Sequence, residues 1–187
     1  RGKQEQEIEF MGLPSSIVVL SMTREMDYNI RHNICLEALK SILQTRCMNV
    51  IREKEGGTYA VNVNQGVVYE PVAQYSMIVE FQCDPLNAAK LKGIVYGELE
   101  RLRQQVPSRD ELMMALNSIR KKEGEARESN VYWQEKLVLY YRTGLNQADV
   151  REFEEIVDKL TPEDFLEFVR EFWENVDITD VVFKPKS

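Results

Sequence analysis

The stretch Ile51-Arg52-Glu53-Lys54-Glu55-Gly56-Gly57-Thr58-Tyr59 marks an abrupt change in the pattern of the chain. Before it, apolar residues recur at helical spacing, and after it they alternate as in a strand. Glycine tolerates the left-handed backbone that a helix exit needs, so Gly56 and Gly57 predict a helix stop. Arg52 and Tyr59 flank this break. A cation and a phenol presented near one junction suit a site that handles a peptide carbonyl or a developing oxyanion.

The first half of the chain predicts strands around one long helix. In chain order, the predicted elements are short strands at 8–11 and 17–20, a helix from an N-cap at Asp27 to about Glu55, and strands at 59–63 and 75–83. The last two strands are joined by a loop with Gly66 and Pro71, which indicates an antiparallel hairpin.

The second half predicts mainly helices. Asp84-Pro85 caps the first of them, and Ser108 with Glu111 forms a capping box for the next, which runs to about residue 126. Further elements are predicted at 132–142, from Gln147, from Thr161-Pro162, and as a closing strand at 178–183. A largely antiparallel sheet with helices packed on one face is an α+β fold, a two-layer α/β sandwich.

Size and charge narrow the function classes. A length of 187 residues predicts a single domain, 1–187, in which the polar residues 1–6 form a linker. The formal net charge of −7 argues against a nucleic-acid surface. No run of about 18 apolar residues occurs, so we expect no membrane span. We therefore expect a soluble protein, and the sequence leaves a cytoplasmic or a periplasmic location open.

The sequence offers too few ligands for a catalytic metal ion. A catalytic zinc needs three protein ligands, and His32 is the single histidine. His32 and Cys35 lie three residues apart in the predicted helix, but no third ligand is apparent. Cys35, Cys47 and Cys83 are an odd number of cysteines at wide spacing, which favours buried free thiols. We predict no metal site within these residues.

Four aromatic residues gather near one predicted helix. Tyr132, Trp133, Tyr140 and Tyr141 are separated by seven and eight residues, as on a helix face. Core or interdomain packing is favoured over a ligand box. The sequence contains no phosphate-binding glycine loop, no nucleophile elbow and no cofactor fingerprint.

The segment IREKEGGTYAVNV, residues 51–63, resembles the arginine–tyrosine segment of the insulinase/pitrilysin family of zinc metallopeptidases, to which mitochondrial processing peptidase belongs. The preceding LPSSIVVLSMTREMDYN and long helix, and the following hairpin and helix, also resemble that family. The likeness is to the C-terminal, non-zinc half of the family's two-domain unit and covers most of the chain. It implies the LuxS/mitochondrial-processing-peptidase-like metallohydrolase fold.

The resemblance also implies roles for the junction residues. Tyr59 would stabilise the transition state, Arg52 would bind a substrate carbonyl, and Gly56 and Gly57 would give the peptide close access to the backbone. The family's H-x-x-E-H zinc motif is absent from this chain. The resemblance therefore implies a chain that is catalytically incomplete alone, with zinc held by an N-terminal partner domain on the same or a separate chain and a peptide as substrate.

Two other functions fit the same residues. The family includes subunits that keep the fold and lose catalysis, so a non-catalytic scaffold is the first alternative. A free-standing binding module is the second. It would leave Arg52 as a cation favoured by the helix dipole and Tyr59 as a good strand former. The sequence upstream of this chain decides between enzyme and scaffold, because H-x-x-E-H would be found there.

Overall fold

The computed structural model describes residues 2–12, 14–55, 60–146 and 149–186, with only the backbone described for 52–55. Within these ranges, the chain forms one mixed sheet of five strands. The strands are β1 (Lys3–Phe10), β2 (Ser16–Glu25), β3 (Val61–Val68), β4 (Gln74–Cys83) and β5 (Asp177–Pro185). Their order across the sheet is β1-β5-β2-β4-β3. β1 pairs with β5 in parallel, and the other neighbours are antiparallel.

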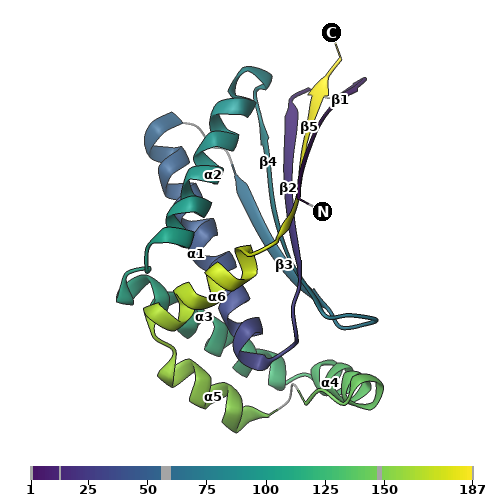
Figure 1. Ribbon diagram of the computed structural model, residues 1–187, viewed down its shortest axis with the longest axis vertical. Coiled ribbons are helices and arrows are strands. Elements are labelled where there is room, and N and C mark those ends of the chain that lie inside the picture. Colours follow the sequence, from purple (N-terminus) through teal and green to yellow (C-terminus); the bar gives the residue numbers. More distant parts are fainter. Residues whose placement is uncertain (1, 13, 56–59, 147–148, 187) are drawn as a thin grey trace.

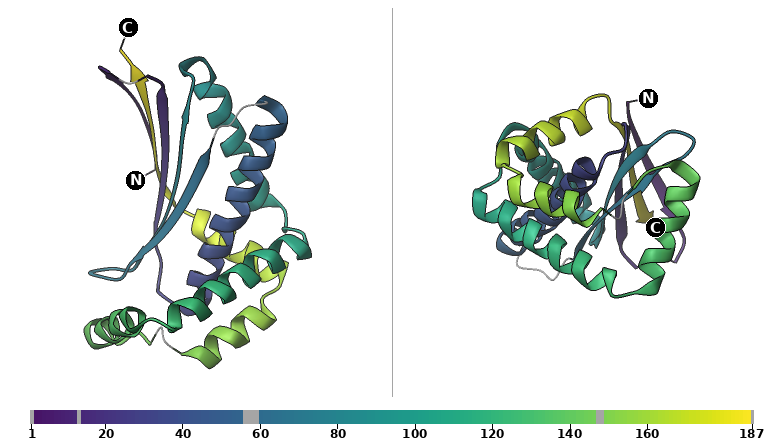
Figure 2. Two further views of the ribbon diagram at one scale, coloured as in Figure 1. Left: turned by 180° about the vertical axis from the view of Figure 1, so that it is seen from behind. Right: turned by 90° about the horizontal axis from the view of Figure 1, so that it is seen from below.

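Helices form the second layer, on one face of this sheet (Figures 1 and 2). The layer consists of α1 (Ile30–Glu55), a short 3-10 turn (Pro85–Asn87), α2 (Ala88–Gln104), α3 (Arg109–Arg127), α5 (Val150–Lys159) and α6 (Pro162–Trp173). A further helix, α4 (Asn130–Thr143), comes between α3 and α5 in the chain. The predicted two-layer α+β architecture with a largely antiparallel sheet is confirmed. α4 stands apart from the layer, near the tip of the β3–β4 hairpin (Figure 1).

The alternation of side chains explains why the helices lie on one face only. Along β4, Tyr75, Met77, Val79 and Phe81 are buried against the helical layer, while the residues between them are partly or fully exposed. α1 contributes a buried stripe that includes Leu39. Because alternate strand residues point to opposite faces, one face joins the core and the other stays open.

No helix within the described part of the chain combines the length and apolar character that crossing a membrane requires.

Helix ends follow local capping rules, with one correction. The capping box of Ser108 and Glu111 is confirmed at the start of α3, with Glu111 N–H donating to Ser108 Oγ at 3.1 Å. The predicted cap at Asp27 is wrong. α1 begins at Ile30, and Asn29 Oδ1 accepts the His32 N–H at 2.7 Å. Met26 N–H still bonds Ala73 O, so the chain follows the sheet too far for a helix to begin at residue 28.

The N-terminal segment joins the sheet edge. Lys3 to Gln6, expected as part of a linker, form the first half of β1. All eight residues of β1 are exposed. β1 is held by its parallel ladder with β5 and by the Gly2 N–H, which donates to Asp177 Oδ1 at 2.7 Å.

Candidate active-site junction

The junction between α1 and β3 is only partly described. Arg52 lies in the last turn of α1, where the structure gives its backbone. Gly56, Gly57 and Tyr59 lie outside the described residues, as does the Arg52 side chain. β3 begins at Val61, two residues after Tyr59, and it is an edge strand of the sheet. The predicted order of long helix, short connection and strand is therefore confirmed, while the four site residues stay a prediction.

Two α1 side chains bind the backbone of β3 just beyond this connection. Val63 N–H donates to Gln44 Oε1 at 2.7 Å, and Gln44 Nε2 donates to Val61 O. Val61 N–H lies 3.4 Å from Met48 Sδ. Backbone groups of alternate strand residues point to the same edge, so these contacts lie on the outer edge of β3. The first residues of β3 are thus bound on this edge by helix side chains instead of a further strand.

The contacts follow the helical repeat toward the junction. Gln44, Met48 and Arg52 are four residues apart, and residues at this spacing lie one turn above another on a helix. Gln44 reaches Val61 and Val63, and Met48, one turn later, reaches Val61. α1 and β3 therefore run in opposite directions along this contact. The sequence prediction missed Gln44 and Met48, although their spacing from Arg52 was visible in the sequence.

His32 and Cys35 lie in the opposite half of α1 and do not form a metal site. His32 Nε2 is 3.6 Å from Glu171 Oε2, and its ring lies 5.5 Å from the Phe168 ring. Cys35 is buried, which raises its thiol pKa to about 12. Cys47 and Cys83 are also buried free thiols, as predicted. Across the described ranges, no group of three His, Cys, Asp or Glu side chains could hold a metal ion.

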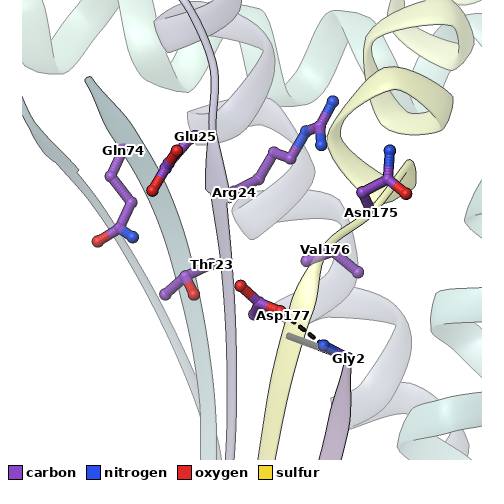
Figure 3. A pocket seen from close by; sticks show the side chains of 8 residues that line it. All are labelled: Gly2, Thr23, Arg24, Glu25, Gln74, Asn175, Val176 and Asp177. Carbon is purple, nitrogen blue, oxygen red and sulfur yellow. Dashed lines mark hydrogen bonds between the residues drawn. The ribbon is translucent and has the colours of Figure 1, made fainter. Parts of the chain in front are cut away.

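A separate pocket lies at the other end of the sheet (Figure 3). Its lining residues are Gly2, Thr23, Arg24, Glu25, Gln74, Asn175, Val176 and Asp177. Arg24 extends toward Asn175, on the opposite side of β2 from Glu25 and Gln74. Gln74 is seven residues along β4 from Phe81, the partner of Val61, a separation of about 23 Å. This mixed-charge pocket is therefore distinct from the junction.

The aromatic residues of α4 do not belong to the core of this domain. Trp133, Tyr140 and Tyr141 are exposed, Tyr141 to 82%. Tyr132 is half-buried, and its hydroxyl donates to Glu123. The core alternative for the exposed three is wrong because α4 stands outside the helical layer. Interdomain packing remains a prediction for them.

Comparison with known proteins identifies the family. The sequence model described as peptidase M16 inactive domain matches residues 2–119, which is more than half of the chain. The chain belongs to the peptidase M16 inactive-domain family. The resemblance to the insulinase/pitrilysin peptidases is thereby confirmed, and the chain is a C-terminal, inactive type of domain from this zinc-protease family.

Relatives of this M16 inactive domain are much longer than the chain. A zinc protease PQQL-like protein of Arabidopsis thaliana is 22% identical over 121 residues, which are 62% of this chain and 13% of that protein. The periplasmic protease PqqL of Escherichia coli shares the fold over 99% of the chain and 21% of its own, with a TM-score of 0.82 and 18% identity. A peptidase M16 inactive domain from Pseudomonas fluorescens matches 100% of the chain and 44% of its own, with a TM-score of 0.75 and 18% identity.

Proposed function

We propose that this M16 inactive domain is the substrate-binding, non-zinc half of a zinc metalloendopeptidase. Residues 1–187 form one domain in this proposal, the C-terminal half of a two-domain unit. The partner is a zinc-binding N-terminal domain, on the same chain or a separate one, and the substrate is a peptide. Family membership supports the general assignment. The described residues offer no metal-binding group of their own, which fits a zinc site located in the partner domain.

The contacts of Gln44 and Met48 with the first residues of β3 are the structural observation that supports this site. The contacts pair position 44 with residues 61 and 63, and position 48 with residue 61. As α1 advances from Gln44 to Met48, its contacts thus shift toward the start of β3, in the direction of the last turn of α1, where Arg52 lies. Arg52 and Tyr59 are both proposed to face the partner domain.

The two side chains then divide the chemistry. Arg52 binds a carbonyl of the peptide through its guanidinium, which fixes the scissile bond in place. The Tyr59 hydroxyl donates a hydrogen bond to the oxygen that becomes negative when the carbonyl is attacked. Zinc bound in the partner domain supplies the activated water. Gly56 and Gly57 lie between Arg52 and Tyr59 in the sequence. Because glycine carries no side chain, they let the peptide approach the backbone closely.

Removal of one hydroxyl tests this assignment. In the peptidase that contains both halves, Tyr59→Phe is expected to lower kcat by about 10²-fold, because an oxyanion donor is lost while the ring remains. Turnover and zinc content are measured together. Tyr96→Phe, which removes a hydroxyl that bonds Asp180 Oδ2 within this domain, is the matched control and should keep wild-type turnover.

The outcome also separates the enzyme from a scaffold. Wild-type turnover in Tyr59→Phe, with zinc fully retained, refutes the role of Tyr59. A natural partner domain that lacks H-x-x-E-H and shows no peptidase activity assigns the chain to a non-catalytic scaffold of the same fold instead.

A further inference from the structure

The pocket drawn in Figure 3 lies where β2 extends past the start of β5. The last residues that pair between these strands are Thr23 and Asp177, but β2 continues to Glu25. Just before Asp177, Asn175 has a left-handed φ of 56°, and the chain there does not pair with β2. The hollow beside β2 has a volume of about 490 Å³, which is in the range of small-molecule sites.

Arg24 lines this pocket and has no partner within the domain. The residue is partly buried, and its Nε atom is buried with no hydrogen-bond partner among the described residues. Two other partly buried arginines behave differently: Arg46 Nε donates to Glu111 and Arg120 Nε donates to Glu154, both at 2.8 Å. A buried donor that has lost water costs free energy unless an acceptor replaces the water. The Arg24 guanidinium therefore lacks an acceptor that its counterparts have.

The two carboxylates that line the pocket do not supply this acceptor. Asp177 Oδ1 accepts the Gly2 N–H at 2.7 Å. Glu25 follows Arg24 along β2, so its side chain points to the opposite face of the sheet. Figure 3 shows Arg24 extending away from Glu25 and toward Asn175. The guanidinium is thus directed into the part of the pocket beside Asn175.

We propose that this pocket binds a carboxylate of a peptide and that the Arg24 guanidinium holds it. A guanidinium can donate two parallel hydrogen bonds to one carboxylate, which gives both affinity and a fixed orientation. The Asn175 amide offers a donor and an acceptor next to it, as a peptide group requires. This binding site goes beyond the proposed function, because it needs neither zinc nor catalysis.

Three capped tripeptides test the need for a carboxylate and identify its source. Acetyl-Gly-Glu-Gly-amide carries only a side-chain carboxylate, acetyl-Gly-Gly-Gly carries only a terminal one, and acetyl-Gly-Gln-Gly-amide carries neither. Saturation-transfer NMR titrations of the full-length protein that contains this domain give the dissociation constants. We expect at least one charged peptide to bind about 10-fold more tightly than the glutamine peptide.

Arg24→Gln is the deciding variant, because it removes the charge and keeps a polar side chain. It should weaken binding of the charged peptide by about 10-fold or more. Arg151→Gln, which removes an exposed arginine on α5, is the matched control and should bind as wild type. Arg24→Lys keeps the charge without the two parallel donors and should bind with intermediate affinity. It also provides the test if Arg24→Gln does not fold.

The same titrations can overturn the proposal. Equal dissociation constants in wild type and Arg24→Gln overturn it, and so does equal binding of all three peptides. A carboxylate bound elsewhere, for example on a zinc ion of the full-length protein, would not respond to Arg24→Gln. If no peptide binds, the proposal is wrong, and Arg24 instead balances the negative carbonyl end of α6, which ends at Trp173.

Discussion

The two edges of the sheet are finished in different ways. At β3, Gln44 and Met48 of α1 bind the outward backbone of the first residues. At β1, every residue is exposed, and charged side chains alternate along the strand: Lys3, Glu5, Glu7 and Glu9. Edge charges hinder pairing with another chain. The comparison shows that the proposed junction lies at the edge held by tertiary contacts, while the other edge is protected by charge.

The largest expected effect comes from replacing the glutamates of β1, which should expose this edge to pairing with another chain. We expect Glu5→Val, Glu7→Val and Glu9→Val together to cause concentration-dependent association, because an exposed edge that keeps only the Lys3 charge can pair with a second copy. Sedimentation velocity across a concentration series measures it. Replacing the exposed helical glutamates Glu125, Glu155 and Glu167 by valine is the control. If both triple variants associate equally, added apolar surface and not the edge is responsible.

The two edges should also differ in their contribution to stability. Val63→Ala removes two buried methyl groups at β3 and should lower the free energy of unfolding by roughly 2 kcal/mol. Ile8→Ala at β1 starts from a residue that is already 38% exposed and should cost less, about 1 kcal/mol. Urea unfolding of both variants gives the difference. Equal losses would mean that β1 is packed as firmly as β3.

A smaller effect on stability is expected from the ion pair between α1 and α3, and it depends on pH. Arg46 of α1 binds Glu111 of α3 through two bonds, Nε to Oε1 at 2.8 Å and a second guanidinium nitrogen to Oε2 at 2.9 Å. The Arg46 hydrogen bond is the main cause that lowers the pKa of Glu111 below its ordinary 4.5. A lowered carboxyl pKa stabilises the fold above pH 4.5, and this contribution is lost as pH falls through the folded-state pKa.

Arg46→Met should therefore flatten the acid limb of the stability profile. We expect wild type to lose about 0.5–1 kcal/mol more than the variant between pH 7 and pH 3, since the pair is partly exposed. Chemical unfolding at both pH values measures this difference. Identical losses in wild type and Arg46→Met would show that the pair does not set the acid sensitivity.

Sequence prediction succeeded where both partners of an interaction are close in the chain. The box of Ser108 and Glu111 needs only four residues, and the alternation of β4 is visible in a ten-residue window. β1 was partly missed because its glutamine- and glutamate-rich start has poor strand propensity and relies on its ladder with β5. The cap at Asn29 was missed because a distant contact, Met26 with Ala73, delays the helix.

The candidate site shows the same limit. The exchange of helix for strand near Gly56 and Gly57 was predictable from local composition, and the structure confirms the elements on both sides. The contact of Gln44 with Val63 joins residues 19 apart and forms only when α1 docks beside β3. The roles of Arg52 and Tyr59 remain a prediction.

The contacts of Gln44 and Met48 with β3 recur at the helical repeat of α1, and this repeat constrains where the domain can gain or lose residues. One residue inserted between Met48 and Arg52 would rotate Arg52 by about 100° around the helix and advance it by about 1.5 Å. The connection between β3 and β4, residues 69–73, joins two strand ends at a surface turn, so an insertion there does not rotate any residue of α1. Insertions and deletions should therefore accumulate in that turn across related domains and be excluded from the last two turns of α1.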